Sequence, residues 1–370
     1  MKINLIDSNL KKKHLDLVSP KKFFKHKKKI CELCNGSNLE TIQSIGRIGS
    51  PLEYGVLKTV ICKQCSHKFL NPIYEDKFYQ TYYRKKYRKV AFGDMTPSKK
   101  YLFYQKKRGE GIYSFFKNKI KTKSNFFLDH GCASGLTMLP WKKEWNCHGI
   151  DPHLPSVIHG KKKYKLNIKC AYGEKLPFKE NFFDTILSLG SLEHSYDIDK
   201  SMKEIVRTLK NNSFLIIRWR SNKLIGSPLE YYNHNHYRFF SKKTWNLLLT
   251  KYGFQSIKNF NENIEGYESY SYILAKLKKD KSKAKQQPII NIDKKVYLKE
   301  IKKYNNYLIS YYRKCVKLKN MLLKKDTFKK RKEFIKQNKV FLLNIGESSA
   351  VNRFCNEALS FLNHVKIVNK

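Results

Sequence analysis

The chain has 370 residues, a length that predicts two or three structural units. Hydrophobic residues make up 41% of the sequence, enough for ordinary buried cores, yet no window approaches the roughly 18 apolar residues of a membrane span. The N-terminus also lacks the apolar stretch of a secretory signal, so a cytoplasmic protein is expected.

Basic residues outnumber acidic residues by 76 to 30, which gives a formal net charge of +46. The lysines are spread along the whole chain, so one interpretation is a general bias of composition. The other is an anionic partner, such as a nucleic acid, a membrane surface or a phosphorylated substrate. Charge alone does not decide between these two interpretations.

Four of the nine cysteines fall in two C-x-x-C pairs, which follow a lysine-rich lead-in at residues 1–30. The pairs Cys31–Cys34 and Cys62–Cys65 predict a tetrahedral Zn²⁺ site in a small zinc ribbon over residues 31–73. Four protein ligands leave no open position on the metal, so the zinc is expected to be structural. The other cysteines are expected to be buried apolar residues, namely Cys132, Cys147, Cys170, Cys315 and Cys355.

Residues 74–124 are rich in Tyr and Lys and predict a helical connector. Short apolar strands then alternate with helical stretches over residues 125–278. This alternation predicts an α/β fold with a doubly wound, mainly parallel Rossmann-like sheet. The candidate apolar positions of the connector are Tyr101, Phe103, Tyr104, Ile112, Phe115 and Phe116, and the expected strands begin near Phe126, Cys147, Asn167, Phe183, Ser213, Gln255 and Tyr270.

The C-terminal part of the sequence is typical of a linker at 279–294, followed by a long basic helix at 295–338. Apolar residues recur along that helix at alternating spacings of four and three, which fits a homodimer through a coiled coil or packing on the same chain. Residues 339–370 predict a small β-α-β tail, which is expected to serve packing.

A glycine-rich loop follows the first strand of the predicted sheet, in the segment L-D-H-G-C-A-S-G. Gly131 and Gly135 allow a sharp turn and a close approach of the backbone to a ligand. Asp129 ends the strand, where its carboxylate can meet a cationic ammonium group. Asp151 ends the second strand, where an acidic residue can accept hydrogen bonds from both ribose hydroxyls of a nucleoside.

This loop resembles the first motif of class I S-adenosylmethionine-dependent methyltransferases, D/E-x-G-x-G-x-G, with Ala133 in place of the middle glycine. The run A-Y-G-E-K-L-P-F, the L-E-H stretch and E-I-V-R-T-L-K before the fifth strand are similar to further segments of that family. By this resemblance Gly173 and Glu174 lie at the adenine edge of S-adenosylmethionine. A dinucleotide G-x-G-x-x-G and a P-loop G-K-[ST] are both missing.

Acceptor-binding residues are expected after the fifth strand, in the segment L-E-Y-Y-N-H-N-H-Y-R-F-F-S at 229–241. This segment, together with the N-terminal cysteine module, resembles sugar C-methyltransferases that act on nucleotide-linked sugars. Their Y-H-E-H-x-x-Y-F-S run matches His234 and His236, whereas Asn235 stands where that run has an acidic residue. These two histidines and His194 are candidates for the general base, and each can also be a hydrogen-bonded structural histidine.

Three functions remain open. The leading interpretation is methyl transfer to a small-molecule acceptor, such as an anionic nucleotide-linked sugar or surface-glycan precursor. The alternative is an RNA methyltransferase, which the zinc module and the charge favour. Against it, the segment after the fourth strand has neither the D/N-P-P-Y/F box nor the Pro-Cys nucleophile of base methylation. The third is a scaffold that binds the cofactor without turnover, because Ala133 and Asn211–Asn212 depart from the family pattern.

Overall fold

The computed structural model describes residues 25–47, 55–85, 87–88, 95–122, 124–220, 238–261, 264 and 270–279. Two of the three candidate bases, His234 and His236, lie outside these residues. So do the predicted helix at 295–338, with its dimer seam, and the predicted tail at 339–370. None of the helices in the described part of the chain has the length and apolar character needed to cross a membrane.

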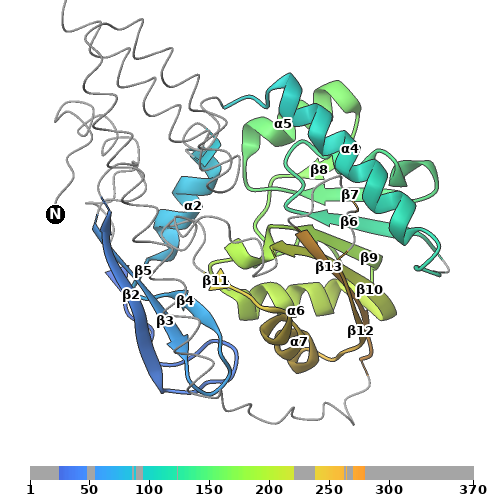
Figure 1. The fold of residues 1–370 in the computed structure, drawn as a ribbon. Coiled ribbons are helices and arrows are strands. Elements are labelled where there is room, and N and C mark those ends of the chain that lie inside the picture. The colour runs from blue at the N-terminus through green and yellow to red at the C-terminus, as the bar shows by residue number, and fades with distance from the viewer. Residues whose placement is uncertain are drawn as a thin grey trace, which may run out of the picture.

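A seven-stranded mixed sheet forms the larger half of the described chain (Figure 1). Five adjacent strands, which reach one edge of the sheet, are parallel. The next strand runs antiparallel to them, and the strand at the other edge pairs antiparallel with it. The predicted doubly wound, mainly parallel sheet is therefore confirmed. In spatial order the strands are β12 (Phe254–Phe260), β13 (Tyr270–Leu277), β10 (Leu209–Arg220), β9 (Phe183–Leu189), β6 (Phe126–His130), β7 (Asn146–Ile150) and β8 (Asn167–Lys169).

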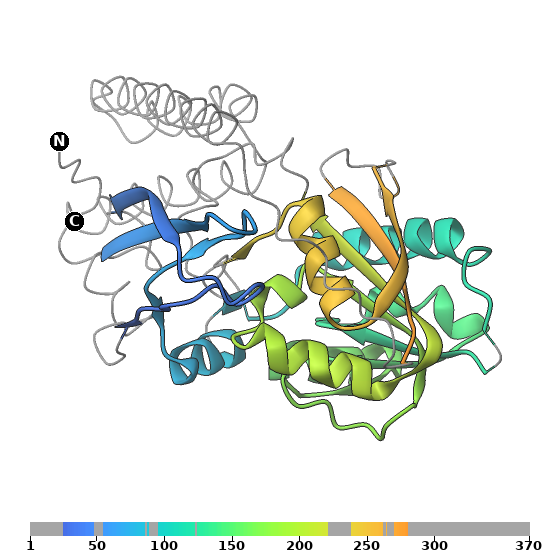
Figure 2. The same ribbon diagram turned by 90° about the horizontal axis from the view of Figure 1, so that it is seen from below.

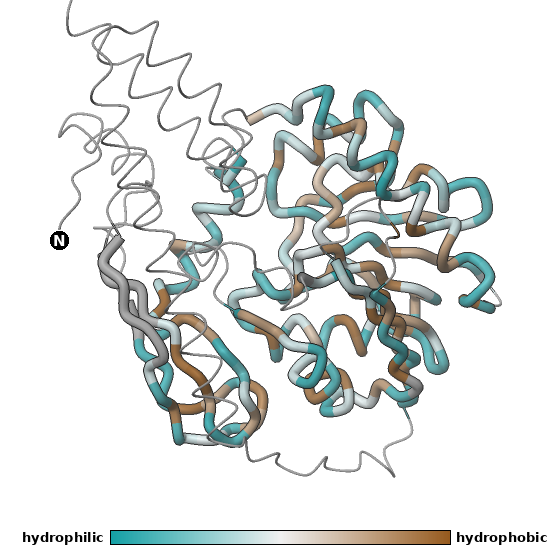
Figure 3. Tube along the Cα trace, viewed as in Figure 1, coloured by the Kyte–Doolittle hydropathy of each residue, from teal (hydrophilic) through white to brown (hydrophobic). Residues whose placement is uncertain are grey.

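Successive residues of the strands point to opposite faces of the sheet and belong to two separate hydrophobic clusters, one on each face. Leu128 of β6 packs with helices α6 (Ile198–Thr208) and α7 (Lys242–Lys251). Its neighbour Phe127 packs with α4 (Lys99–Phe116) and α5 (Leu154–Tyr164) on the opposite face. Figure 3 shows the hydrophobic residues gathered along the strands, with hydrophilic residues on the outer surfaces.

The connection between β6 and β7 contains two short 3₁₀ turns, Leu136–Met138 and Trp141–Lys143, where a crossover helix is usual. The helix α4, which precedes the sheet, covers this region instead. Gly109 of α4 lies so close to the backbone of Thr137 that an added Cβ would come within 2.6 Å of it.

The apolar stripe predicted for α4 is partly wrong. Phe103 and Tyr104 are 57% and 38% exposed, whereas Ile112 and Phe116 are buried as expected. The buried positions follow the helical spacing of three and four residues, which excludes Phe103 and Tyr104. They are Leu102, Gln105, Gly109, Ile112 and Phe116.

The cysteine-containing segment forms a small antiparallel sheet beside the large one (Figures 1 and 2). Its own strands are β2 (Leu39–Arg47), β3 (Gly55–Cys62) and β4 (Lys68–Leu70). A two-residue strand from far along the chain, β11 (Arg238–Phe239), pairs with β4 and completes it. Nearby, β1 (Lys25–His26) pairs with β5 (Ile73–Tyr74), and α2 (Asp76–Lys85) leads on towards α4.

The two sheets share one hydrophobic core. Leu33 and Phe69 of the small sheet region belong to the same buried cluster as Trp245 of α7. The ring of Phe240, which follows β11, stacks on Trp245 with centroids 3.9 Å apart and lies 4.9 Å from the ring of His67. The cysteine module is thus packed directly onto the face of the large sheet that α6 and α7 cover.

Candidate functional site

The glycine-rich loop lies at the carboxyl end of β6, where the chain order of the sheet reverses between β6 and β9. In open α/β sheets, ligands bind at this switch point. Gly131, Ala133 and Gly135 have φ angles of +80°, +50° and +76°. A Cβ on Gly131 would come within 2.4 Å of the Cβ of Ser191, so this position requires glycine. Ala133 takes the left-handed conformation that the family's glycine would take more easily.

Asp151 fastens this loop to the end of β7. Its Oδ2 accepts a hydrogen bond of 2.7 Å from the backbone N–H of Ala133, and its Oδ1 accepts one of 2.8 Å from His153. The carboxyl group is 9% exposed. Burial raises its pKa, and the positive charge of Arg88 opposes that rise. Asp151, the predicted ribose-binding residue, therefore also stabilises the glycine-rich loop.

Asp129 is a buried acid at the end of β6. Its side chain is 2% exposed, and its Oδ2 has no hydrogen-bond partner within the described part of the chain. Burial, together with the nearby negative charge of Asp151, raises the pKa of Asp129 to about 7, although Arg108 and Arg218 pull it the other way. Two neighbouring carboxyl groups that are shielded from water favour the binding of a cationic ligand group such as an ammonium.

The predicted adenine-edge residues follow β8. A Cβ on Gly173 would come within 2.3 Å of Nε2 of His130, so only glycine fits there without a shift. Burial lowers the pKa of His130 to about 4, which keeps this imidazole neutral. Glu174 is half-buried, and its Oε1 accepts a 3.4 Å hydrogen bond from the backbone N–H of Asp197. Burial raises the pKa of Glu174.

Comparison with known proteins agrees with this arrangement. Residues 128–217 match the sequence model of a methyltransferase domain family. The described part of the chain therefore contains a class I S-adenosylmethionine-dependent methyltransferase domain. The matched span begins in β6 and ends in β10, so it holds the loop, the acid pair and the L-E-H turn.

Two curated relatives match part of the chain. An uncharacterized protein of Methanocaldococcus jannaschii is 36% identical over 107 residues, which are 28% of this chain and 45% of that protein. A ubiquinone biosynthesis O-methyltransferase of Pelagibacter ubique is 36% identical over 96 residues, 24% of this chain and 40% of that protein. The chain thus spans less than half the length of the curated relatives it matches.

Solved structures of methyltransferases are also similar. A SAM-dependent methyltransferase of Thermotoga maritima has 16% identity and a TM-score of 0.39, and the match covers 48% of this chain and 94% of that one. One of Archaeoglobus fulgidus has 18% identity and a TM-score of 0.38, covering 48% of this chain and 100% of that one.

Of the three predicted bases, the structure describes only His194. His194 ends a 3₁₀ turn, Leu192–His194, directly after β9. Ser191 anchors this turn through hydrogen bonds with His130 and with Ser188. Nδ1 of His194 lies 3.3 Å from the hydroxyl of Tyr83 on α2, so the cysteine module's neighbouring helix reaches the turn.

Two residues near Gly190, Arg218 and Glu193, were not predicted as site residues. A Cβ on Gly190 would lie 3.4 Å from Nη2 of Arg218 and 3.6 Å from Oε1 of Glu193. Arg218 is 7% exposed and lies over the ring of Tyr270, 4.0 Å from its centroid. A signal was present in the sequence, because an arginine interrupts the otherwise apolar strand L-I-I-R-W.

The four predicted metal ligands come together in the cysteine module. All four Sγ atoms lie within 4.8 Å of one another, and the pairs Cys31–Cys65 and Cys34–Cys62 are each 3.5 Å apart. A tetrahedral site with Zn–S bonds of about 2.3 Å has S···S distances near 3.8 Å, so the cluster fits zinc. Hydrogen bonds within the cluster lower the pKa of Cys62 and raise the pKa values of Cys31 and Cys65.

Both cysteine pairs sit in turns of the same construction. The backbone N–H of Asn35 donates to the carbonyl of Cys31, and that of Ser66 donates to Cys62. Asn35 and Ser66 have φ angles of +59° and +69°, which turn the chain back after each pair. Of the other described cysteines, Cys132 and Cys147 are buried as expected, but Cys170 is exposed. The expectation for Cys170 was wrong because β8 ends at Lys169, one residue earlier.

Proposed function

We propose that the protein transfers a methyl group from S-adenosylmethionine to a small anionic acceptor, namely a nucleotide-linked sugar or surface-glycan precursor. The observation that carries the proposal is the buried acid pair Asp129 and Asp151 at the glycine-rich loop. Oδ2 of Asp129 has no hydrogen-bond partner among the described residues. The family match to a methyltransferase domain identifies the kind of ligand that would supply one.

The cofactor-binding roles follow from the contacts described above. When bound, S-adenosylmethionine supplies a methyl group already activated on a sulfonium. Asp129 would hold its ammonium group, and the carboxylate of Asp151 has lone pairs beyond the two backbone hydrogen bonds for ribose hydroxyls. Gly173 and Glu174 would border the adenine. The loop at Gly131 would let the cofactor approach the backbone closely.

The chain's own task in the reaction would be to orient the acceptor and to remove its proton. His194 is the candidate base that the structure describes, and Tyr83 would orient its ring through the 3.3 Å contact to Nδ1. His234 and His236 remain candidates by their resemblance to the sugar C-methyltransferase run. Each substitution to Ala should lower turnover while cofactor affinity is retained, if that residue is the base.

The acceptor class is supported by the resemblance of residues 229–241 and by the charge of +46, which favours encounter with an anionic ligand. The test is a methyl-transfer assay with labelled cofactor, offering pooled nucleotide sugars and total RNA to the full chain. Label in the sugar pool is the expected result. Label found only in RNA would overturn the acceptor proposal in favour of an RNA methyltransferase.

We also propose that the four-cysteine cluster holds one structural Zn²⁺ per chain. The support is the S···S spacing of the cluster and its burial in the shared core. Elemental analysis of protein purified without chelators should find one zinc per chain. Cys34→Ser should lose that zinc, whereas Cys147→Ser, outside the cluster, should keep it. Zinc-free wild-type protein that stays equally stable would contradict the proposal.

A further inference from the structure

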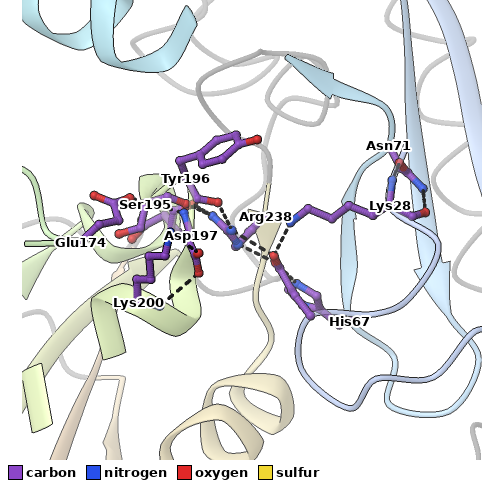
Figure 4. A network of polar contacts seen from close by, with 11 residues as sticks. Lys28, His67, Asn71, Glu174, Ser195, Tyr196, Asp197, Lys200 and Arg238 are labelled. Carbon is purple, nitrogen blue, oxygen red and sulfur yellow. Dashed lines mark hydrogen bonds and ion pairs between the residues drawn. The ribbon is translucent and has the colours of Figure 1, made fainter. Parts of the chain in front are cut away.

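A buried arginine joins the cysteine module to the methyltransferase domain. Arg238 belongs to β11, the short strand that completes the small sheet, and its side chain is fully buried. Figure 4 shows its guanidinium between the cysteine module on one side and the chain around Ser195 and Tyr196 on the other. The same side chain therefore contacts both parts of the molecule.

On the module side, Arg238 binds the carboxylate of Glu32 with two hydrogen bonds. Nε lies 2.5 Å from Oε1, and Nη2 lies 2.9 Å from Oε2. Glu32 is the residue between Cys31 and Leu33 in the first C-x-x-C turn, so the metal-binding turn fixes its backbone. Lys28 and His67 contact the same carboxylate at 2.6 Å and 3.2 Å.

On the methyltransferase side, Arg238 donates to backbone carbonyls that follow the L-E-H turn. Nη1 donates to the carbonyl of Ser195 and Nη2 to that of Tyr196, the latter at 2.9 Å. Nη1 also lies 3.5 Å from the carbonyl of Glu193. Carbonyls at the end of a helical turn lack partners within the turn, so the guanidinium supplies them.

The contacts continue from this segment to the proposed cofactor site. The backbone N–H of Asp197, directly after Tyr196, donates to the carboxylate of Glu174 at 3.4 Å. Asp197 also caps the N-terminus of α6, because its side chain accepts a hydrogen bond from the N–H of Lys200. Arg238 thus holds a segment that has the candidate base at one end and the adenine-edge carboxylate at the other.

The position of the Arg238 guanidinium depends on its ion pair with Glu32. A buried guanidinium needs a nearby carboxylate, and Glu32 supplies one in bidentate geometry. Without Glu32, or with its turn released from the metal, the guanidinium would lose the contact that sets its position. The three carbonyls would then lose their donor together.

We propose that Arg238 is a positioning residue that couples the four-cysteine site to the L-E-H turn and to Glu174, so that metal binding tightens the cofactor site. This inference rests on the proposed function for its meaning in catalysis. The coupling itself is a property of the chain that can be measured without turnover.

The test uses the full chain and two readouts, hydrogen exchange of the peptide covering 191–197 and calorimetric affinity for S-adenosylhomocysteine. The perturbed forms are Arg238→Gln, Glu32→Gln and zinc-stripped wild type. Each should speed exchange in this peptide by about tenfold, since local opening responds to the loss of hydrogen bonds. Each should also weaken S-adenosylhomocysteine binding by about fivefold, within the range of coupling between connected sites.

Two matched controls separate positioning from general damage. Glu40→Gln removes an exposed ion pair with Lys63 inside the same module and should change neither readout. Arg238→Lys keeps the charge but loses the two-pronged geometry, so it should restore the readouts only in part. The double variant of Glu32 and Arg238 should be no worse than the more severe single variant, because the two residues act as one unit.

Unchanged exchange at 191–197 in both Glu32→Gln and zinc-stripped protein would overturn the proposal, even if Arg238→Gln failed to fold. Additive losses in the double variant would also overturn it. A wild-type chain that bound no S-adenosylhomocysteine would instead refute the proposed function, and the exchange data would still decide the coupling.

Discussion

Two buried aspartates lie on neighbouring parallel strands of the large sheet but at opposite ends. Asp184 is at the amino end of β9, and Asp129 is at the carboxyl end of β6; they are 4% and 2% exposed. Asp184 accepts hydrogen bonds from Ser124 and from the backbone N–H of Phe126, and it pairs with Lys210 at 2.9 Å. Asp129 faces a second acid and has an oxygen without a hydrogen-bond partner among the described residues.

The difference supports the proposal that a ligand binds at the carboxyl end of the sheet. Lys210 and the hydrogen-bond donors around Asp184 compensate its charge, as expected for a buried carboxylate. The positive groups near Asp129 only lower a pKa that burial and Asp151 raise. A cationic group from outside would complete the site at Asp129, and this is why the comparison supports a cofactor at the carboxyl end alone.

Asp184→Asn should lower the stability of the protein. The substitution removes the charge partner of Lys210 and weakens the hydrogen bonds to Ser124 and Phe126. Because Lys210 is 29% exposed, the loss should be about 2 kcal/mol, below that of a fully buried pair. Urea denaturation should show a lower midpoint with an unchanged slope, and cofactor affinity of the folded protein should be retained. If Asp184→Asn were as stable as wild type, the contrast between Asp184 and Asp129 would be contradicted.

Asp129→Asn should act in the opposite direction. With a folded pKa of about 7, the ionised form of Asp129 costs stability, and this cost is absent below the ordinary carboxyl pKa and complete above pH 7. The cofactor-free variant should therefore be more stable than wild type at pH 8 and equally stable near pH 4. Urea denaturation at these two values is the measurement, and a loss of stability at pH 8 would contradict the assignment.

Cofactor binding should depend on pH through the same group. Below pH 7, an ammonium ligand must displace the proton of Asp129, so affinity should fall by up to about tenfold per unit as pH decreases. It should level off above pH 7, until the ligand's amino group loses its proton near pH 8. Calorimetry in two buffers should detect proton release at pH 6, and Asp129→Asn should abolish it. Release that persists in the variant would assign the proton to another group.

The smallest expected effect comes from Ala133→Gly. Ala133 has a φ angle of +50°, a conformation that costs an L-residue about 1 kcal/mol. Glycine removes that strain but costs about 0.5–1 kcal/mol in the unfolded chain, so stability should change by less than about 1 kcal/mol. The 2.7 Å hydrogen bond to Asp151 uses the backbone and is kept. A large drop in cofactor affinity would show that the Ala133 methyl group itself contacts the ligand.

The sequence predicted the parts of the structure that depend on local pattern. Apolar runs found the strands of the large sheet, and the spacing of Cys31, Cys34, Cys62 and Cys65 anticipated their cluster. These features succeed because one strand or one turn carries its own signal. Phe103 shows the limit, since its exposure depends on the helical phase fixed by contacts with the loop at Thr137.

Contacts between distant segments could not be predicted in this way. The bond between Glu32 and Arg238 joins residues 206 positions apart, and β11 is only two residues long. Neither carries a periodic pattern. The sequence places Asp129 and Asp184 in strands, but the partners that distinguish them come from other segments and become visible only in the fold.

The most direct test of the account is calorimetric titration of S-adenosylhomocysteine into the wild-type chain, Asp151→Ala and Asp184→Asn. Wild type should bind, and Asp151→Ala should bind at least about tenfold more weakly, because a charge-assisted hydrogen bond contributes about 1.5–3 kcal/mol. Asp184→Asn should bind like wild type at a temperature where it is folded. No binding by wild type, or equal affinity in Asp151→Ala, would contradict a cofactor site at the carboxyl end of the sheet.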